Sequence, residues 1–359
     1  MTYRVIQWST GNVGRLALRA IIEHPDLELV GLWVHSADKV GRDAGELAGV
    51  GPTGVLATND VDALLALDAD VVSHNATGDL RPQEAVAEMC RFLESGKNVV
   101  SSSVVSLLYP PSADPRVVAR LEQACTTGNA SLFTSGIDPG FANDLLPLTL
   151  AGFCEEIESL RVQEILNYAT YDQPEVLFET MGFGKPLDET PMLLQPGVLS
   201  LAWGSVVRQL AAGLGVSLDE VSETYIREPA PEDFDIASGQ IPKGSAAALR
   251  FEVRGMVDGK AAVILEHVTR LRDDLCPDWP QPAQEGGSYR IEITGEPTYA
   301  MDLCLSSPNG DHNHAGLVAT ASRVVNAIPA VIAAPPGVRT TLDLPLITGN
   351  GLYAGGKSG

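Results

Sequence analysis

Residues 3–14 read Tyr3-Arg4-Val5-Ile6-Gln7-Trp8-Ser9-Thr10-Gly11-Asn12-Val13-Gly14. The first six residues are typical of a buried parallel strand, and the next six form a turn with two glycines. In a dinucleotide-binding turn, one glycine lets the backbone approach the pyrophosphate and another lets the next helix pack closely on the strand. Gly11 and Gly14 stand at those positions, and Ser9 replaces the usual first glycine. We therefore expect residues 9–14 to bind a dinucleotide.

The elements around this turn favour the same interpretation. A helix is expected from Val13 to Glu23, and an apolar strand follows from Leu27 to Val34. A phosphate at the helix N-terminus would face free N–H groups and the positive end of the helix dipole. The sequence therefore predicts a dinucleotide-binding βαβ unit. The alternative is a βαβ unit that binds nothing.

The residues at the end of the second strand distinguish between NAD and NADP as the coenzyme. NAD-binding units usually carry an acidic residue there, whereas the 2′-phosphate of NADP needs hydrogen-bond donors and positive charge. The chain reads His35-Ser36-Ala37-Asp38-Lys39-Val40-Gly41-Arg42. Ser36 can donate a hydrogen bond, Lys39 and Arg42 can neutralise a phosphate, and Asp38 is the one contrary residue. We expect NADP rather than NAD, contacted by His35, Ser36, Lys39 and Arg42; the alternative is a solvated surface turn.

Composition limits the class of protein. The chain has 359 residues, 45% of them hydrophobic, which is enough for a large core and two domains. Its net charge of −22 argues against nucleic acid and anionic membranes as partners. The five cysteines are odd in number and widely spaced, as in a cytoplasmic protein with reduced thiols rather than a disulfide framework or a zinc site. We expect a cytoplasmic protein with a small-molecule substrate and no metal.

No segment predicts export or membrane insertion. The N-terminus enters a strand within three residues and lacks the charged and apolar regions of a signal peptide. The apolar stretch from Ala315 to Ala334 is interrupted by Arg323, Asn326 and Pro329. It is typical of a packed helix and not of a membrane span.

Strands and helices alternate over the first part of the chain. After the βαβ unit, we expect strands near Gly54–Thr58, Asp70–His74, Asn98–Ser101 and Ala130–Thr134. Helices between them complete a Rossmann-type, doubly wound parallel sheet over residues 1–143, an α/β fold.

Ligands of such sheets bind outside the carboxyl ends of the strands. The further cofactor contacts expected there are Asn75, Ala76, Thr77, Ser101 and Ser103. Small polar residues suit the close approach of a flat nicotinamide ring. Asn75 and Thr77 would equally suit a turn that caps the helix starting at Pro82, and the serines a plain loop.

Past Gly140 the alternation stops. Long strands are expected near Glu158–Asn167, Ala247–Val257, Ala261–Leu271 and Tyr289–Ile293, with Asp258-Gly259 as a hairpin turn. We expect a mostly antiparallel sheet, a helix near Ser200–Leu214, and loops at Glu228–Gly244 and Cys276–Gly287. The second domain is thus an α+β domain.

Several motifs besides the nucleotide turn point to one family. They are Lys39-Val-Gly-Arg-Asp-Ala-Gly45, Gly96-Lys-Asn-Val-Val-Ser101, Gly136-Ile-Asp-Pro-Gly-Phe141, Val324-Val-Asn-Ala-Ile-Pro329 and Ala334-Pro-Pro-Gly337. With these motifs the chain resembles the NAD(P)-dependent amine dehydrogenases related to 2,4-diaminopentanoate dehydrogenase, over nearly its whole length. Its architecture more distantly resembles that of dihydrodipicolinate reductase.

The resemblance implies a domain plan and a reaction. It implies a nucleotide domain (1–143), a sheet domain that lines the substrate pocket and often makes a homodimer (144–311), and a C-terminal helix that returns to the first domain (312–359). It also implies reduction of an imine made from a carbonyl compound and ammonia, or the reverse deamination. Such a reaction needs a hydride from the nicotinamide and separate groups that move protons.

The chain departs from the family pattern at the proton-moving groups. The resemblance implies an acidic residue in the loop after the fifth strand, but residues 103–108 read Ser-Val-Val-Ser-Leu-Leu. The candidates to replace it are Tyr168 and Tyr171, as hydrogen-bond and proton donors, and Glu164, whose pKa burial would raise. The alternative is that the tyrosines simply pack with their hydroxyls at the surface.

Three further features carry weaker interpretations. His312 and His314 would share one face of an extended segment and bind metal, but a third ligand is not obvious, so a loop or helix-capping role is expected. Asp138 is expected to cap a helix that begins near Phe141. Arg323 and Asn326 share a helix face, where either could reach the cofactor or merely tie the domains together; we expect Asn326 to contact the cofactor.

Three functions remain open at this point. The first is an NADP-dependent oxidoreductase of amine dehydrogenase type that acts on a small carbonyl compound, imine or amine. The second is a carbonyl reductase that works without ammonia, and the third is a sensor that binds NADP(H) and catalyses nothing. NADPH consumption with and without ammonium separates them.

Overall fold

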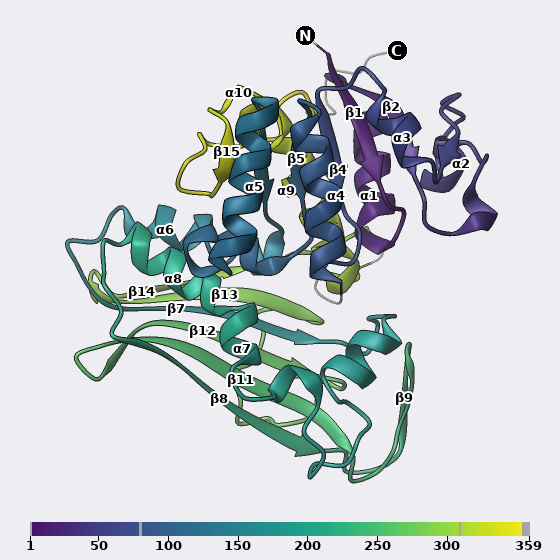
Figure 1. Cartoon of the computed structure of the whole chain (residues 1–359). Coiled ribbons are helices and arrows are strands. Elements are labelled where there is room, and N and C mark those ends of the chain that lie inside the picture. Colours follow the sequence, from purple (N-terminus) through teal and green to yellow (C-terminus); the bar gives the residue numbers. More distant parts are fainter. Residues whose placement is uncertain (1, 79–80, 309, 354–359) are drawn as a thin grey trace. The chain divides into compact units, whose positions relative to one another are not determined.

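The computed structural model describes residues 2–78, 81–308 and 310–353, and its chain divides into two compact units. Unit 1 consists of residues 1–137 and 317–359, and unit 2 of residues 138–316. These limits lie a few residues from the domain boundaries at 143 and 312 given above. Figure 1 shows the elements of each unit.

Unit 1 contains a seven-stranded sheet in the order β15-β6-β5-β4-β1-β2-β3, and every neighbouring pair is parallel. This sheet confirms the predicted Rossmann-type fold. The strands are β1 (Tyr3–Trp8), β2 (Leu27–Trp33), β3 (Ala57–Thr58), β4 (Val71–His74), β5 (Asn98–Ser101), β6 (Ser131–Thr134) and β15 (Gly337–Arg339). The sequence pattern did not indicate β15, because three residues after two prolines give no periodicity.

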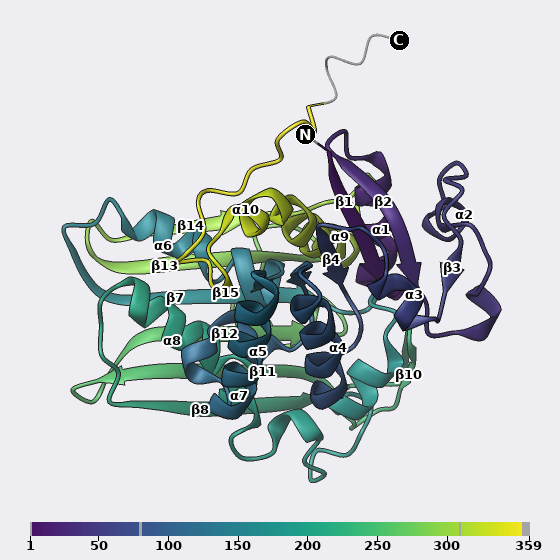
Figure 2. The same ribbon diagram turned by 45° about the horizontal axis from the view of Figure 1, so that its top comes forward.

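Helices cover both faces of this sheet. They are α1 (Asn12–Glu23), α2 (Ala44–Ala48), α3 (Val61–Leu65), α4 (Pro82–Glu94), α5 (Pro115–Gly128), α9 (His312–Asn326) and α10 (Ile328–Ala333). One core forms between the sheet and α4 with α5, and another between the sheet and α1 with α9 and α10. Figure 2 shows the same elements from another direction.

The apolar helical segment His312–Ala333 is long enough to cross a membrane by length and composition alone. Within unit 1, however, Val324, Ile328 and Val331 are buried in the core against the sheet. A core helix passes the same test, so the predicted packed helix accounts for this segment.

Unit 2 is built on a six-stranded sheet in the order β14-β13-β7-β12-β11-β8. Only β12 and β7 pair in parallel, so the predicted mostly antiparallel sheet is confirmed. The strands are β7 (Glu156–Asn167), β8 (Glu220–Pro229), β11 (Ala246–Val257), β12 (Lys260–Arg270), β13 (Gly287–Glu296) and β14 (Tyr299–Leu303). The edge strands β8 and β14 were not predicted, since polar residues interrupt their apolar alternation.

The remaining elements of unit 2 precede or connect these strands. They are α6 (Leu145–Ala151), α7 (Val198–Ala202), α8 (Gly204–Gly213) and the hairpin β9 (Phe234–Ile236) and β10 (Gly239–Ile241). The expected loop at 228–244 therefore contains two short strands, and the helix expected at 200–214 is interrupted at Trp203. The core lies on the sheet face that carries Leu160, Phe251 and Leu265, and it includes residues of α8.

Short helical turns complete the chain. They span Ala37–Lys39, Val105–Leu108, Pro110–Ser112, Glu175–Thr180 and Met192–Leu194. The segment Ile137–Phe141 has non-helical backbone angles and includes a cis peptide bond between Asp138 and Pro139.

Candidate functional site

The turn after β1 has the geometry that a dinucleotide requires. Ser9 has a φ of +81°, which is the left-handed conformation that the usual glycine would adopt at this position. A Cβ added to Gly14 would lie 2.5 Å from the carbonyl oxygen of Ser9, so only glycine lets α1 approach the turn this closely. A Cβ at Gly11 would meet no atom nearer than 3.9 Å. The space in front of Gly11 is thus open to a ligand.

The structure brings the predicted phosphate-binding lysine onto this turn. The Nζ of Lys39 donates to the Oγ1 of Thr10 over 3.1 Å. Ser36 begins the helical turn that carries Lys39 and is half-buried. Arg42 is exposed and pairs with Glu46 at 2.6 Å, and His35 is exposed. The ammonium of Lys39 therefore lies beside the turn, whereas the guanidinium of Arg42 is paired with Glu46.

The carboxyl ends of β1, β4 and β5 are joined by buried hydrogen bonds. Gln7 donates to Asn75 at 3.0 Å, and Asn75 donates to the hydroxyl of Ser102 at 2.9 Å. Ser101 donates to the carbonyl of His74 at 3.0 Å, and the hydroxyl of Ser103 donates to the carbonyl of Ala76. The polar side chains Asn75, Ser101 and Ser103 thus have partners within the protein and hold the two loops together.

The residues next to these loops complete the edge of the sheet. The carbonyl of Thr77 accepts from Arg81 at 3.2 Å. Val104 has a φ of +60°, an unusual conformation for a β-branched residue that marks backbone strain of the kind found at functional sites. Asn326, the last residue of α9, is half-buried, and its side chain has no hydrogen bond to this network among the described residues.

A half-buried carboxylate of α4 contacts side chains at the same edge of the sheet. Glu88 of α4 accepts from the Nε1 of Trp8 at 3.1 Å, pairs with the Nε2 of His74 at 2.9 Å and with Arg81 at 3.0 Å. Burial opposes ionisation of Glu88, but the hydrogen bonds from His74 and Arg81 outweigh it and lower its pKa. The Trp8 ring also stacks on Trp33 at 4.3 Å. Glu88 therefore fixes Trp8 and His74 at the ends of β1 and β4, and Arg81 before α4.

Replacing Glu88 by alanine is expected to lower the free energy of unfolding by about 3 kcal/mol, because the buried His74 and Trp8 lose their acceptor. Urea unfolding at neutral pH measures this loss. Since the pKa of Glu88 is lowered on folding, its contribution is present above the ordinary carboxyl pKa and disappears as the pH falls through the lowered value. The exposed Glu84 of the same helix is the control; an equal loss in Glu84→Ala would contradict the assignment.

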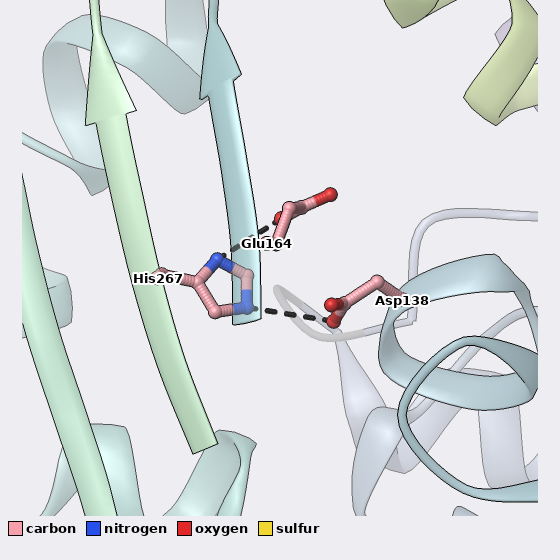
Figure 3. Close-up of side chains that lie close together, drawn as sticks. All are labelled: Asp138, Glu164 and His267. Atoms are coloured by element: carbon pink, nitrogen blue, oxygen red, sulfur yellow. Dashed lines mark ion pairs between the residues drawn. The ribbon is translucent and has the colours of Figure 1, made fainter. Parts of the chain in front are cut away.

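Unit 2 contains a cluster of three buried ionisable side chains, Asp138, Glu164 and His267 (Figure 3). The Nδ1 of His267 lies 3.0 Å from Glu164, and its Nε2 lies 3.4 Å from Asp138. The three side chains are only 2–9% exposed. The contact between the Nε2 of His267 and the carboxylate of Asp138 is an ion pair without a hydrogen bond. The imidazole thus bridges two carboxylates.

The register of the sheet explains why these side chains meet. Phe251 pairs with His267, His267 with Glu164, and Glu164 with Tyr289, across β11, β12, β7 and β13. Paired residues point to the same face, so the four side chains form one row. The His267 ring stacks on Phe251 at 4.7 Å and meets Trp203 edge-on at 4.8 Å.

Burial and mutual charge set the protonation of the cluster. Burial opposes the imidazolium of His267, but Asp138 and Glu164 outweigh it and raise its pKa to about 10. Burial and the charge of Asp138 raise the pKa of Glu164, and His267 only partly offsets them. His267 is therefore cationic at neutral pH, and Glu164 takes up a proton more readily than an ordinary glutamate.

Two of the predicted donors lie next to the cluster in the sequence and stack on each other. The rings of Tyr168 and Tyr171 are 4.6 Å apart. Burial and the charge of Glu164 raise the pKa of both hydroxyls. Burial also raises the pKa of Tyr289, which hydrogen-bonds to Glu164. Tyr168 and Tyr171 are both partly buried and pack against the core of unit 2.

The structure corrects one expectation about this region and adds one residue that the sequence did not indicate. Asp138 does not cap a helix, because α6 begins at Leu145 and its cap is Asp144; the side chain of Asp138 faces His267 instead. His267 was not among the predicted residues, since one histidine within an apolar strand gives no local signal.

His312 and His314 do not lie in the extended segment expected from the sequence. Both lie in the first turn of α9, where residues two apart do not share a face. The Nδ1 of His312 lies 3.2 Å from the carbonyl of Leu305, and burial lowers the pKa of His312. Asp311 accepts from the backbone of Asn313 and His314 and caps the helix.

Comparison with known proteins identifies the family. Residues 141–351 match the family model of the 2,4-diaminopentanoate dehydrogenase C-terminal domain, and residues 5–102 match that of the dihydrodipicolinate reductase N-terminus. An amine dehydrogenase of Streptomyces virginiae is 42% identical over 95% of this chain and 96% of its own length. The 2,4-diaminopentanoate dehydrogenase of Acetoanaerobium sticklandii is 26% identical over 96% and 93%.

A solved structure agrees with these matches. The amine dehydrogenase of Mycobacterium smegmatis aligns with a TM-score of 0.80 at 21% identity, over 98% of this chain and 99% of its own. This likeness confirms the fold, and the sequence matches confirm the predicted resemblance. The chain therefore belongs to the family of amine dehydrogenases and 2,4-diaminopentanoate dehydrogenase, and it is an oxidoreductase with an NAD(P)-binding fold.

Proposed function

We propose that the protein is an NADP-dependent amine dehydrogenase that interconverts a small ketone or aldehyde with the primary amine. In the reductive direction, a carbonyl compound, ammonium and NADPH give the amine, NADP⁺ and water. The observation that carries this proposal is the buried cluster of Asp138, Glu164 and His267, which supplies acid–base groups that the loop after β5 lacks.

The charge of the cluster suits a nitrogen substrate. One imidazolium faces two carboxylates, so the cluster has an excess of negative charge when both acids are ionised. A buried negative charge favours an ammonium or iminium cation beside it. The raised pKa of Glu164 lets this group take a proton from ammonium and return it to the departing water.

The chain connection supports the placement of Asp138 in the reaction. Asp138 follows Thr134, the last residue of β6, by four positions. An extended chain spans this separation in at most about 14 Å. The carboxyl ends of the strands are where such sheets bind their coenzyme, and bound NADPH supplies the hydride for the imine carbon.

The preference for NADP rests on Ser36 and Lys39. Lys39 reaches Thr10 in the predicted phosphate-binding turn, which supports a place for its ammonium beside the ribose of a bound coenzyme. The residues that hold the pyrophosphate are those of the turn, Ser9 to Gly14. The conformation of Ser9 and the close approach at Gly14 fit a dinucleotide.

The same charge argument predicts the substrate class. In unit 2, over residues 138–308 and 310–316, no lysine or arginine pairs with Asp138 or Glu164; His267 is their charged partner. A carboxylate on the substrate would meet two carboxylates and one imidazolium there, and hence a net charge of its own sign when both acids are ionised. We therefore expect amines and ketones without a carboxylate.

Initial rates of NADPH consumption test the proposal with paired ketones that differ only by a carboxylate. We expect turnover that depends on ammonium, and a kcat/KM at least about tenfold higher for the ketone without the carboxylate, as unfavourable charge contacts imply. Turnover without ammonium would instead identify a carbonyl reductase, and tight coenzyme binding without any turnover a sensor.

A further inference from the structure

The segment 39–57, between β2 and β3, is organised around the side chain of Asp43. Its carboxylate accepts from the backbone N–H groups of Gly45 at 2.7 Å, Thr53 at 3.0 Å and Gly54 at 2.7 Å. The hydroxyl of Thr53 adds a contact at 3.3 Å. The side chain of Asp43 thus holds Thr53 and Gly54, which follow it by ten and eleven positions. These backbone hydrogen bonds lower the pKa of Asp43.

The segment is compact enough for this side chain to set its shape. A Cβ on Gly45 would lie 2.0 Å from the carbonyl oxygen of Gly51, so the two backbones are in direct contact. On the other side, Gly41 donates to Ala57 at 2.8 Å, and Ala57 donates to Arg42 at 2.9 Å. The residues just before Asp43 are therefore held against β3.

These residues are the ones that meet the coenzyme in the proposed function. The backbone of Arg42 donates to Lys39 at 3.2 Å, which closes the turn between them. The ammonium of Lys39 reaches Thr10, whereas the guanidinium of Arg42 is engaged by Glu46. The position of Lys39 over the phosphate-binding turn thus depends on the path of the backbone that Asp43 fixes.

We propose that Asp43 is a positioning residue for coenzyme selectivity, which acts by holding Lys39 at the place of the 2′-phosphate. The carboxylate itself does not touch the coenzyme in this role. The inference rests on the proposed preference for NADP. It predicts that weakening the hydrogen bonds of Asp43 raises the KM for NADPH and leaves the KM for NADH nearly unchanged, because NADH has no 2′-phosphate.

Steady-state kinetics of Asp43→Asn in the full-length protein test this inference, with both coenzymes. We expect the KM for NADPH to rise about tenfold, as for the loss of one charge-assisted contact, while the KM for NADH changes less than about twofold and kcat is kept. The matched control is Asp60→Asn, because Asp60 caps α3 through the same kind of contact but lies outside segment 39–57.

The outcomes separate the inference from the proposed function. An equal rise in both KM values, or no rise at all, would overturn the role of Asp43. A wild-type protein that does not prefer NADPH would overturn the coenzyme assignment and this inference with it. If circular dichroism shows that Asp43→Asn is unfolded, Thr53→Val replaces it, because this variant removes only the hydroxyl contact. We expect a smaller rise in the KM for NADPH and none in the KM for NADH. An equal rise in both KM values, or no rise, would contradict the inference.

Discussion

Replacing Asp138 by asparagine is expected to lower kcat by about 10²- to 10⁴-fold, the usual contribution of a general acid–base group. The substitution keeps the size of the side chain and removes one of the two charges that face His267. Coenzyme affinity should remain near the wild-type value, since Asp138 is not among the residues expected to hold the coenzyme. Steady-state kinetics and calorimetric titration with NADPH measure the two effects separately.

The pH dependence distinguishes a proton-moving role from a merely structural one. Folding raises the pKa of His267 to about 10, so the stabilisation from its charged form is complete below its ordinary pKa of 6.5 and is lost as the pH rises through 10. Without Asp138, the alkaline limb of the kcat profile should move to lower pH. An unshifted limb would contradict the role given to the cluster.

A buried acid on the opposite face of the same sheet is the control. Glu252 pairs with Arg161 at 2.6 Å and is 8% exposed at its side chain, but it points away from the face that carries His267. Glu252→Gln should lower stability and leave kcat within about twofold, since weakening a buried ion pair on the other face of the sheet acts on folding and not on the cluster. A loss of kcat as large as that of Asp138→Asn would show that any buried charge has this effect.

The second large effect is expected at the two glycines of the nucleotide turn. Gly11→Ala should leave thermal stability unchanged, because its Cβ meets nothing within 3.9 Å in the protein. It should nevertheless weaken coenzyme binding by at least about tenfold, because the methyl group occupies the space where the pyrophosphate approaches.

Gly14→Ala should affect both properties. Its Cβ would lie 2.5 Å from a backbone oxygen of Ser9, which cannot rotate away as a side chain does. We expect a loss of about 1–3 kcal/mol in the free energy of unfolding and no measurable coenzyme binding. Fluorescence of the stacked Trp8 and Trp33 reports binding in both variants. Wild-type affinity in Gly11→Ala would contradict the position of the pyrophosphate.

The nucleotide-binding half of this molecule was predictable because its signals are local. The turn at residues 9–14 and the stretch 35–42 each lie within a few residues of a strand, and the carboxyl ends of parallel strands share one edge of the sheet. Ser9 illustrates the limit: the sequence marks the position, and only the structure gives its left-handed conformation.

The acid–base cluster was only partly predictable. Glu164 was found because it lies near the end of a recognisable strand, but its partner His267 comes from another strand far along the chain. Their meeting depends on the register of the sheet, which no short pattern reports. Asp138 was misassigned as a helix cap because an aspartate before a helix suits both roles. The homodimer and the cytoplasmic location stay predictions.

Transfer of label from [4,4-²H₂]NADPH to the product tests the central claim most directly. With a simple ketone and ammonium, we predict a primary amine that carries one deuterium on the carbon bonded to nitrogen, detected by mass spectrometry. A deuterated alcohol, or an amine without the label, would contradict the account.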